Sequence, residues 1–438
     1  MGTLYPNRYL KILEASPALL RAAENAGIPQ GDPGAPALCC VMGPALAEFT
    51  RWLLLNAVQE RIERLYFLAR DGWWMREAAQ IFCAEYGLPV ECRYLSCSRH
   101  ALRLPLFHRN HAASLDRLCA PGPASTPDRL LARAGLTPEE RSAVLRELAL
   151  PLRADAPIPR ADMPQFCAAL GRSTAFLTLA DRHSRRALPA LAGYLAQEGL
   201  AAGKHDAVVD SGWIGTLQQS LTDACALIGR EERVTGFYFG LYEVPRAARR
   251  ADYRCYYFSP EGGLREKAHF SNNLFEAVMT APHGTTTHYA HAGVACIPVY
   301  APMAETHRIR ILQCGELMMR YIRSLAHTMG RDEFFRADFS AHRRTVRRLL
   351  QAWMDTPTHG EAVYFGTLPF SDDVLPGADR ELAVPPAPAL IPRSEPWHAG
   401  SRVRYMNRTG ASPRYTLYQY ARHSRASRPY QVRKEVRP

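Results

Sequence analysis

The side chains best suited to chemistry stand in short polar turns that follow apolar, strand-like runs. The first turn is Arg70-Asp71-Gly72, which ends the run 65–69 and precedes a helical pattern. In an open α/β sheet such a turn lies at the carboxyl end of a strand, where the next helix presents free N–H groups to an anion. Arg70 would attract that anion, and Asp71 could act as a base or hold a metal ion. A helix cap beside a surface arginine is the alternative for the same residues.

A second turn, at residues 210–216, has more of the groups that bind phosphate. Asp210 ends an apolar strand, and hydroxyls and glycines follow it. Glycine permits positive φ and a close approach of the backbone, so the turn can cradle a phosphate at the start of a helix. Asp210 could hold a metal ion, orient a ribose hydroxyl or act as a base; an ordinary glycine-containing turn with an aspartate cap is the alternative. The predicted phosphate-binding residues are Ser211, Gly212, Gly215 and Thr216.

Two further segments add a cation and groups suited to proton transfer. The strand-like run 90–95 ends in small hydroxyls followed by Arg99, which predicts another contact to an anion. Downstream, a short helical pattern with Glu276 leads into a turn that begins at His283, and carboxylate and imidazole are common proton-transfer groups. A capped helix end with a surface histidine is the alternative. Further ligand contacts are predicted from Gly72, Ser98 and Asn273.

Asp71, Asp210, Glu276 and His283 are thus the predicted catalytic residues. The first two are also the candidate metal ligands, and Mg²⁺ is the cofactor that paired carboxylates would hold. The eleven cysteines are scattered without any Cys-x-x-Cys pair, so neither a zinc site nor a disulfide framework is expected. Reduced thiols are typical of a cytoplasmic protein.

Only a parallel sheet would bring these turns to one edge. The predicted fold class is α/β, with a Rossmann-like parallel sheet core, a helical insertion that caps the sheet, and a helical C-terminal region. If the turns share the carboxyl edge of one sheet, Asp71 and Asp210 should face a common cleft. The predicted strands are 65–69, 90–95, 206–210, 234–242 and 253–258, and helices are predicted over 9–26, 309–325 and 331–353.

Changes in pattern and composition divide the chain into six segments. A helical insertion interrupts the two parts of the core, and proline-rich sequence follows the last helical region. The segments are an N-terminal helical segment (1–42), the first part of the core (43–101), the helical insertion (102–203), the second part of the core (204–300), a helical region (301–356) and an irregular, Pro-rich, basic tail (357–438).

The positive charge of the chain is concentrated at its end. Eleven Lys or Arg and two Glu fall within residues 393–438, so this segment carries +9 of the formal net charge of +12. The charges are dispersed, which favours a solvated tail over a nucleic-acid partner. Removing the tail should therefore leave ligand binding intact. No run approaches the roughly 20 apolar residues of a membrane span, and the first residues lack a signal-peptide core, so a cytoplasmic location is expected.

Four sequence motifs resemble a bacterial family. The motifs lie at residues 66–72, 94–99, 210–216 and 273–284, and they occur in this order in the family. The chain is similar to the C-terminal module of predicted haloacid-dehalogenase (HAD) superfamily hydrolases that accompany glycosyltransferases in surface-polysaccharide gene clusters. The resemblance implies a HAD-like, Rossmann-like fold. An aspartyl-phosphate phosphatase also needs an Asp-x-Asp pair, which this sequence lacks, so that reaction is not carried over to any residue.

A weaker resemblance is to the loops of type I phosphoribosyltransferases. Residues 68–72 look like their Arg-Gly-Gly turn, and residues 208–216 look like their diphosphate-ribose loop. That loop normally has paired acids, whereas position 209 is Val here. The resemblance supports a phosphosugar or nucleotide site rather than the transferase reaction.

These observations together predict a protein that acts on a phosphorylated sugar or a nucleotide-sugar, in the biosynthesis of bacterial surface polysaccharide. Whether it would act as a hydrolase or a transferase stays open. The alternatives are a non-catalytic ligand-binding or scaffolding module that serves a glycosyltransferase, and a phosphoribosyltransferase-like enzyme.

Overall fold

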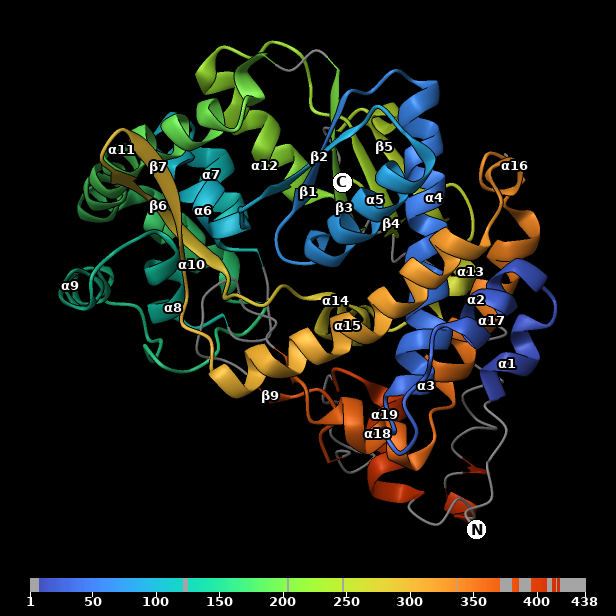
Figure 1. Cartoon of the computed structure of the whole chain (residues 1–438). Helices are drawn as coiled ribbons and strands as arrows, with labels where there is room; N and C mark the ends of the chain where they lie inside the picture. Colours follow the sequence, from blue (N-terminus) through green and yellow to red (C-terminus); the bar gives the residue numbers. More distant parts are fainter. Residues whose placement is uncertain are drawn as a thin grey trace.

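A five-stranded, fully parallel sheet in the order β2-β1-β3-β4-β5 forms the centre of the protein (Figure 1). This confirms the predicted α/β class. The strands are β1 (Arg64–Leu68), β2 (Glu91–Leu95), β3 (Asp206–Trp213), β4 (Gly236–Leu241) and β5 (Tyr253–Phe258). The computed structural model describes residues 8–120, 125–202, 205–245, 248–336, 338–370, 380–385, 395–407, 412–414 and 416–417.

Successive residues of the strands face opposite sides of the sheet, as the two-residue repeat of a β-strand requires. In β1, Leu65 and Phe67 join the larger hydrophobic core, whereas Tyr66 and Leu68 join a second core on the other face. Both faces are therefore covered by other elements. Double burial explains why these strands appear in the sequence as continuous apolar runs rather than alternating ones.

The larger core packs one face of the sheet against long helices. The helix α5 follows β1 directly and ends at Gly87, whose φ of +63° gives a left-handed C-terminal cap. In Figure 1 α15 runs obliquely between the sheet and the C-terminal helices. The helices that contribute to this core include α4 (Gly43–Gln59), α5 (Gly72–Tyr86), α14 (Asn272–Met279), α15 (Glu305–Thr328) and α17 (Ser340–Asp355).

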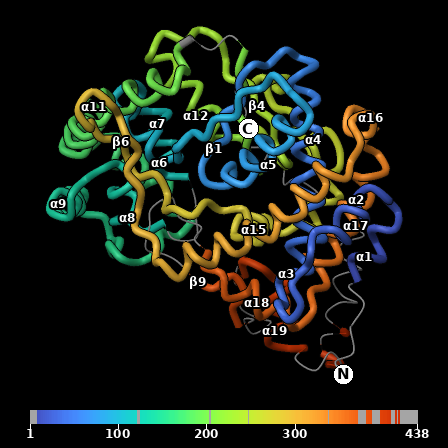
Figure 2. Tube along the Cα trace, viewed as in Figure 1, coloured from blue at the N-terminus to red at the C-terminus, as the bar shows by residue number. Residues whose placement is uncertain are grey.

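The opposite face is covered by three helices and by a β-hairpin. The hairpin was not predicted from the sequence. The hairpin packs against α11, where Gln197 Oε1 accepts a hydrogen bond from the backbone N–H of Cys296 at 3.0 Å. Figure 2 shows β6 of this hairpin beside α11. These elements are α6 (Arg99–Arg103), α11 (Thr174–Gln197), α12 (Thr216–Cys225), β6 (Thr286–Ala292) and β7 (Ala295–Tyr300).

The insertion between β2 and β3 is helical, as its sequence predicts, and has its own hydrophobic core. Its helix starts follow capping rules: Thr137 and Glu140 form a reciprocal capping box at the start of α9. Besides α6 and α11, the insertion includes α7 (His111–Leu118), α8 (Pro127–Arg133), α9 (Pro138–Leu148) and α10 (Met163–Arg172).

Several predicted boundaries differ from the structure. The single helix predicted over 9–26 is two helices, because Pro17 starts a new one. The helix predicted over 331–353 is likewise interrupted, between residues 334 and 340. The remaining α-helices and β-strands of the described residues are α1 (Arg8–Leu13), α2 (Pro17–Asn25), α3 (Ala35–Ala37), α13 (Leu264–Lys267), α16 (Arg331–Phe334), α18 (His359–Gly366), β8 (Pro369–Phe370), β9 (Arg380–Glu381) and α19 (His398–Met406).

Part of the segment after residue 357 is ordered against the core, although irregular structure was predicted for it. Trp397 is 1% exposed, and its indole Nε1 donates to the Met354 carbonyl at 2.9 Å. The segment from residue 393 is therefore not a solvated tail throughout, as was expected, because truncation there would remove a core side chain. Most of the basic residues after 407 lie outside the described residues.

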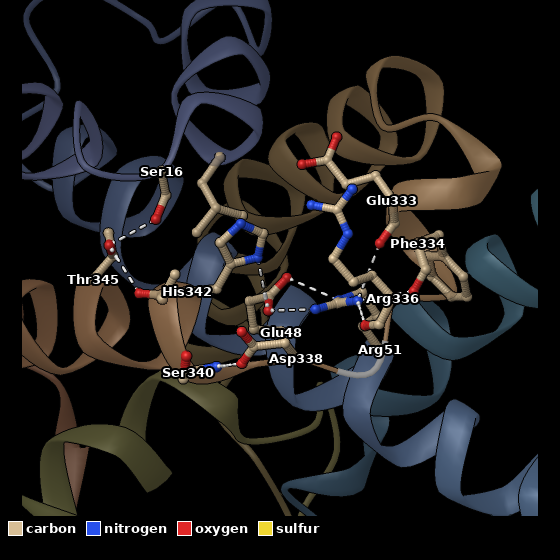
Figure 3. Close-up of polar contacts among 12 residues, drawn as sticks. Ser16, Glu48, Arg51, Glu333, Phe334, Arg336, Asp338, Ser340, His342 and Thr345 are labelled. Atoms are coloured by element: carbon tan, nitrogen blue, oxygen red, sulfur yellow. Dashed lines mark hydrogen bonds and ion pairs between the residues drawn. The ribbon is translucent and has the colours of Figure 1, made fainter.

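A buried ionic cluster joins α4 to the C-terminal helices (Figure 3). Glu48 and Arg51 are 0% and 1% exposed, and their side chains pair at 3.3 Å. Arg51 also donates to the carbonyls of Phe334 and Arg336 at 2.8 Å, and so satisfies backbone groups at the end of α16. His342 Nδ1 lies 3.1 Å from the Glu48 carboxylate. Every charge in this cluster therefore has a partner.

The helical segment Ala35–Gln59 is long and apolar enough to cross a membrane, the one such segment among the described residues. Its most apolar window is 94% buried inside the protein. It is a core helix here, which is consistent with a soluble protein.

Candidate functional site

The ends of β1 and β3 define the candidate site. These strands are parallel neighbours, and β1 is flanked by β2 on its other side, so the chain leaves the sheet in opposite directions from β1 and β3. This strand order places a topological switch point between β1 and β3, and ligands of open α/β sheets bind outside the carboxyl ends of the strands at such a point. The turns that contain Asp71 and Ser211 are the ones that meet there.

A hydrogen bond joins the two turns directly. The Ser211 hydroxyl donates to Asp71 Oδ2 at 2.5 Å. Burial raises the pKa of Asp71, while this hydrogen bond and the positive charge of Arg70 oppose the rise. The Ala69–Arg70 peptide that precedes Asp71 is cis. The predicted meeting of the first and second turns at one sheet edge is thus confirmed in its geometry.

The strand β3 extends farther than predicted. Asp210 was expected to end the strand, but β3 continues to Trp213 and the turn comes at residues 214–215. Gly212 has a φ of +112°, and a Cβ there would lie 2.5 Å from the Gly240 carbonyl oxygen. Trp213 has a φ of +73°, a conformation that a bulky side chain adopts only at a steric cost of about 1–3 kcal/mol. With this irregular backbone, the end of β3 directs Ser211 toward Asp71 and Trp213 toward Glu276 of α14.

Trp213 brings Glu276 of α14 into the site. Its indole Nε1 donates a hydrogen bond to Glu276 Oε1. Burial, and next the negative charge of Asp71, raise the pKa of Glu276 to about 7. A carboxyl group with such a pKa can both donate and accept a proton near neutral pH. Glu276 was predicted from its residue type. Trp213 was not predicted, because it has no reactive group of its own, although it lies between two predicted ligand residues.

Asp210 lies near the other acids but leaves the strand on the opposite side from Ser211, because neighbouring strand residues alternate. Burial and the charge of Asp71 raise the pKa of Asp210 well above its ordinary value. Arg99 weakly opposes this rise. Asp210 in turn helps to raise the pKa of the buried Cys97 thiol. The three carboxylates of Asp71, Asp210 and Glu276 therefore form one electrostatically coupled group.

Two arginines near the carboxylates are not committed to protein partners. Arg70 is half-buried and Arg99 is exposed. Within the described part of the chain, neither guanidinium group donates a hydrogen bond or forms an ion pair. Arg70 and Glu276 line a cavity of about 560 Å³, a size that suits a small-molecule ligand. Its walls also include Met303, Arg310, Leu368 and Phe370.

The predicted glycine and threonine ligands have structural explanations as well. A Cβ at Gly72 would lie 2.7 Å from the Phe67 carbonyl carbon, so this glycine permits α5 to pack on β1. Gly215 has a φ of +68° and precedes α12, and a Cβ there would lie 2.7 Å from the Tyr253 ring. Thr216 is the first residue of α12 and half-buried, at the position where a helix N-terminus offers free N–H groups.

Three predicted site residues make protein contacts of their own. The Ser98 hydroxyl caps α6 and donates to the Thr286 carbonyl at 2.7 Å. Asn273 Nδ2 donates to the Pro396 carbonyl at 2.9 Å and so connects α14 to the segment before α19. His283 has both ring nitrogens engaged, with the Tyr94 hydroxyl and the Gly284 carbonyl each at 2.8 Å.

These contacts fix the state of His283. The carbonyl can only accept, so Nδ1 carries the proton and Nε2 accepts from Tyr94. Burial lowers the pKa of His283, and the positive charge of Arg70 contributes to the lowering. With both nitrogens engaged, the neutral His283 imidazole is held in one orientation beside the Tyr94 ring. Glu276 is better placed than His283 to transfer a proton.

Within the described ranges, no group of three or more His, Cys, Asp or Glu side chains is arranged to hold a metal ion. Mg²⁺ commonly takes one or two protein carboxylates and keeps several waters, so the pair Asp71 and Asp210 still has suitable donor chemistry. Burial raises the pKa of Asp71, whereas burial and then the negative charge of Asp71 raise the pKa of Asp210, a repulsion that a cation would relieve.

Comparison with known proteins assigns no relative. No protein-family model matches the chain, and no curated protein matches its sequence. The geometry and electrostatics of the site itself are therefore the evidence for its function.

Proposed function

We propose that the chain binds a phosphorylated sugar or nucleotide-sugar in the cavity at the carboxyl edge of its sheet and acts on it by proton transfer. The observation that carries the proposal is the combination found at the switch point: three coupled carboxylates beside two arginines with no protein partner, next to a cavity of about 560 Å³. Arginine binds phosphate groups well because its planar fork donates two parallel hydrogen bonds.

The residues divide into binding and reacting groups. Arg70 binds the phosphate at the cavity, and Arg99 supplies a second positive charge on the Asp210 side. Glu276, with a pKa of about 7, gives or takes the proton of a sugar hydroxyl or leaving group. Asp71 and Asp210 are the residues that would hold Mg²⁺, which would supply charge neutralisation for the phosphate.

The resemblance to modules of surface-polysaccharide clusters makes a cytoplasmic role beside a glycosyltransferase part of this proposal. The rival function is a binding or scaffolding module without catalysis. The engagement of both His283 nitrogens favours this rival, because it commits the imidazole to protein partners and leaves proton transfer to the carboxyl groups.

Calorimetric titration of a panel of sugar phosphates and nucleotide-sugars, with and without Mg²⁺, tests the proposal. Arg70→Met should weaken the binding of the selected ligand by about 10- to 100-fold, the effect of losing a charged hydrogen bond. Arg153→Met removes an exposed arginine far along the insertion and is the matched control. Equal affinity in the two variants would refute a phosphate site at Arg70.

The same ligand separates the two functions. Glu276→Gln keeps the shape of the side chain and should preserve binding while abolishing turnover, followed by NMR of the ligand. If the wild-type protein binds the ligand and leaves it unchanged over long incubation, the binding-module function is correct and the proton-transfer role of Glu276 is wrong.

A further inference from the structure

A second polar cavity lies away from the sheet edge. It has a volume of about 240 Å³ and lies between α13–α14 and the segment that begins α19. The helix α14 contributes to both cavities, because Asn273 lines this one and Glu276 lines the other. The proposed function does not use the smaller cavity. Its polar lining includes Lys267, His269, Asn272, Asn273, Glu395 and His398.

Lys267 is the unusual residue of this lining. Its Nζ donates to the Phe270 carbonyl at 3.3 Å and lies 5.6 Å from the centre of the Tyr242 ring. It forms no ion pair with any acid of the described residues. Burial, with no opposing charge, lowers the pKa of Lys267 to about 8. A partly buried ammonium group without a counter-ion is unfavourable unless a ligand supplies the negative charge.

The carboxylates around the cavity do not pair with this ammonium group, because each has another partner. Glu395 is paired with His398 at 2.6 Å and with Arg402 at 3.2 Å. Asp355 Oδ2 lies 2.5 Å from Nδ1 of His269. The Lys267 ammonium group is therefore left for the negative charge of a ligand to balance.

The cavity also offers hydrogen-bonding groups of both kinds. The Asn272 side-chain Oδ1 is buried and has no hydrogen-bond partner. The N–H groups of Asn272 and Asn273 begin α14, and Ala399 lies in the first turn of α19, positions whose N–H groups have no acceptor within their own helix. A ligand with negative oxygens and one hydroxyl would satisfy the donors and the acceptor together.

We propose that this cavity binds a compact phosphate, either inorganic phosphate or the phosphate group of a small monoester, with Lys267 as its counter-ion and Asn272 as the acceptor of a P–OH or ligand hydroxyl. Sulfate has the same shape but no hydroxyl to donate near neutral pH, so it binds less tightly than phosphate. The binding site is independent of the proposed function, because it shares no ligand-contacting residue with the sheet edge.

Chemical labelling of lysine tests the proposal on the unmodified protein. The sequence has only four lysines, at positions 11, 204, 267 and 434, so reductive methylation can be followed at each by peptide mass spectrometry. Millimolar phosphate should slow the methylation of Lys267 several-fold. It should leave the exposed Lys11 unchanged, which is the internal control. A Lys267 rate that is the same with and without phosphate would overturn the proposal.

A variant experiment identifies the ligand class and separates the two cavities. Inorganic phosphate, glycerol phosphate and sulfate are titrated by calorimetry into Arg70→Met, in which the sheet-edge phosphate site is weakened. In this background Lys267→Met should abolish phosphate binding, whereas Lys11→Met should not. Tighter binding of glycerol phosphate than of inorganic phosphate identifies a monoester ligand, and the reverse order identifies the free ion.

Phosphate binding as tight in the Arg70→Met, Lys267→Met protein as in Arg70→Met would refute the site. Sulfate binding as tight as phosphate would refute the role of Asn272. If Lys267→Met fails to fold, protection of Lys267 from methylation in Arg70→Met protein decides the question. A failure of the sheet-edge proposal would leave all these results unchanged.

Discussion

Two of the places where acids and arginines come together, α4 and the sheet edge, differ in how their charges are balanced. At α4, Glu48 and Arg51 are buried and paired with each other. Arg51 also donates hydrogen bonds to backbone carbonyls (Figure 3). At the sheet edge, Arg70 has no hydrogen-bond or ion-pair partner among the described residues and lies beside carboxylates that repel one another. Complete pairing is typical of a structural cluster. Incomplete pairing beside a cavity indicates a site that a ligand completes.

The direction of the pKa shifts expresses the same difference. Burial acts to raise the pKa of Glu48, but the hydrogen bond from His342 and the charge of Arg51 hold it below its usual value. At the sheet edge, burial acts with the charge of Asp71, and the pKa of Glu276 rises to about 7. The fully buried Glu48 keeps its charge more readily than the half-buried Glu276, so neighbouring groups and not burial alone decide the direction of the pKa shift.

Removing the arginine should have the largest effect in the structural cluster. Arg51→Met leaves the Glu48 charge buried without its partner and should lower the free energy of unfolding by about 3–5 kcal/mol. Arg70→Met is the matched change at the sheet edge and should alter stability by no more than about 0.5 kcal/mol. Urea unfolding followed by tryptophan fluorescence measures both. Equal losses would mean that Arg70 is as structural as Arg51.

The two acids should respond to pH in opposite directions. The folded protein holds the Glu276 proton up to a pKa of about 7, whereas the unfolded chain releases it near 4.5, so Glu276 lowers stability as pH rises between these values. Glu276→Gln should therefore raise the melting temperature above pH 7 and have little effect near pH 4.5.

Glu48 has a lowered pKa, so it stabilises the folded state above the ordinary value of 4.5 and loses this contribution as pH falls below it. Glu48→Gln should be less stable than the wild type at neutral pH, with a gap that narrows on acidification. Melting curves recorded across this pH range test both variants. Parallel pH dependence in the two would contradict the assignment of opposite shifts.

The smallest effect should come from the hydrogen bond between the two turns. Ser211→Ala removes the donor to Asp71 and should lower the free energy of unfolding by about 1 kcal/mol while raising the Asp71 pKa further. Ser142→Ala, which removes an exposed hydroxyl that bonds within α9, is the control and should change stability by less than about 0.5 kcal/mol. No difference between the two serine variants would show that the turns are held together by other contacts.

The sheet could be predicted because its strands are buried on both faces. The apolar runs of β1, β4 and β5 stand out in the sequence, and each prediction is within two residues of the structure. The hairpin over residues 286–300 was missed, because its strands contain several polar side chains and Pro298. An alternating, mostly half-exposed pair of strands has no continuous apolar signal.

Within the site, the sequence identified acids and cations but not their surroundings. Asp71, Asp210 and Glu276 were selected by residue type and position, and their coupling appears only in three dimensions. Gly212 suggested a turn after Asp210, whereas it lets β3 continue close to the Gly240 backbone. The burial of Glu48 was not predictable either, because a charged residue in an amphipathic helix normally faces water and its partner at position 342 is remote in sequence.

The separation of Arg51 from its carbonyl partners has a consequence for the newly made chain. Those partners follow it by 282 to 285 residues, so α4 emerges from the ribosome long before the groups that cover it. Until then an apolar helix with two unshielded charges is exposed, which makes the nascent chain a client for molecular chaperones. Fragments that end before α16 should aggregate when expressed alone, even though they contain all five strands of the sheet.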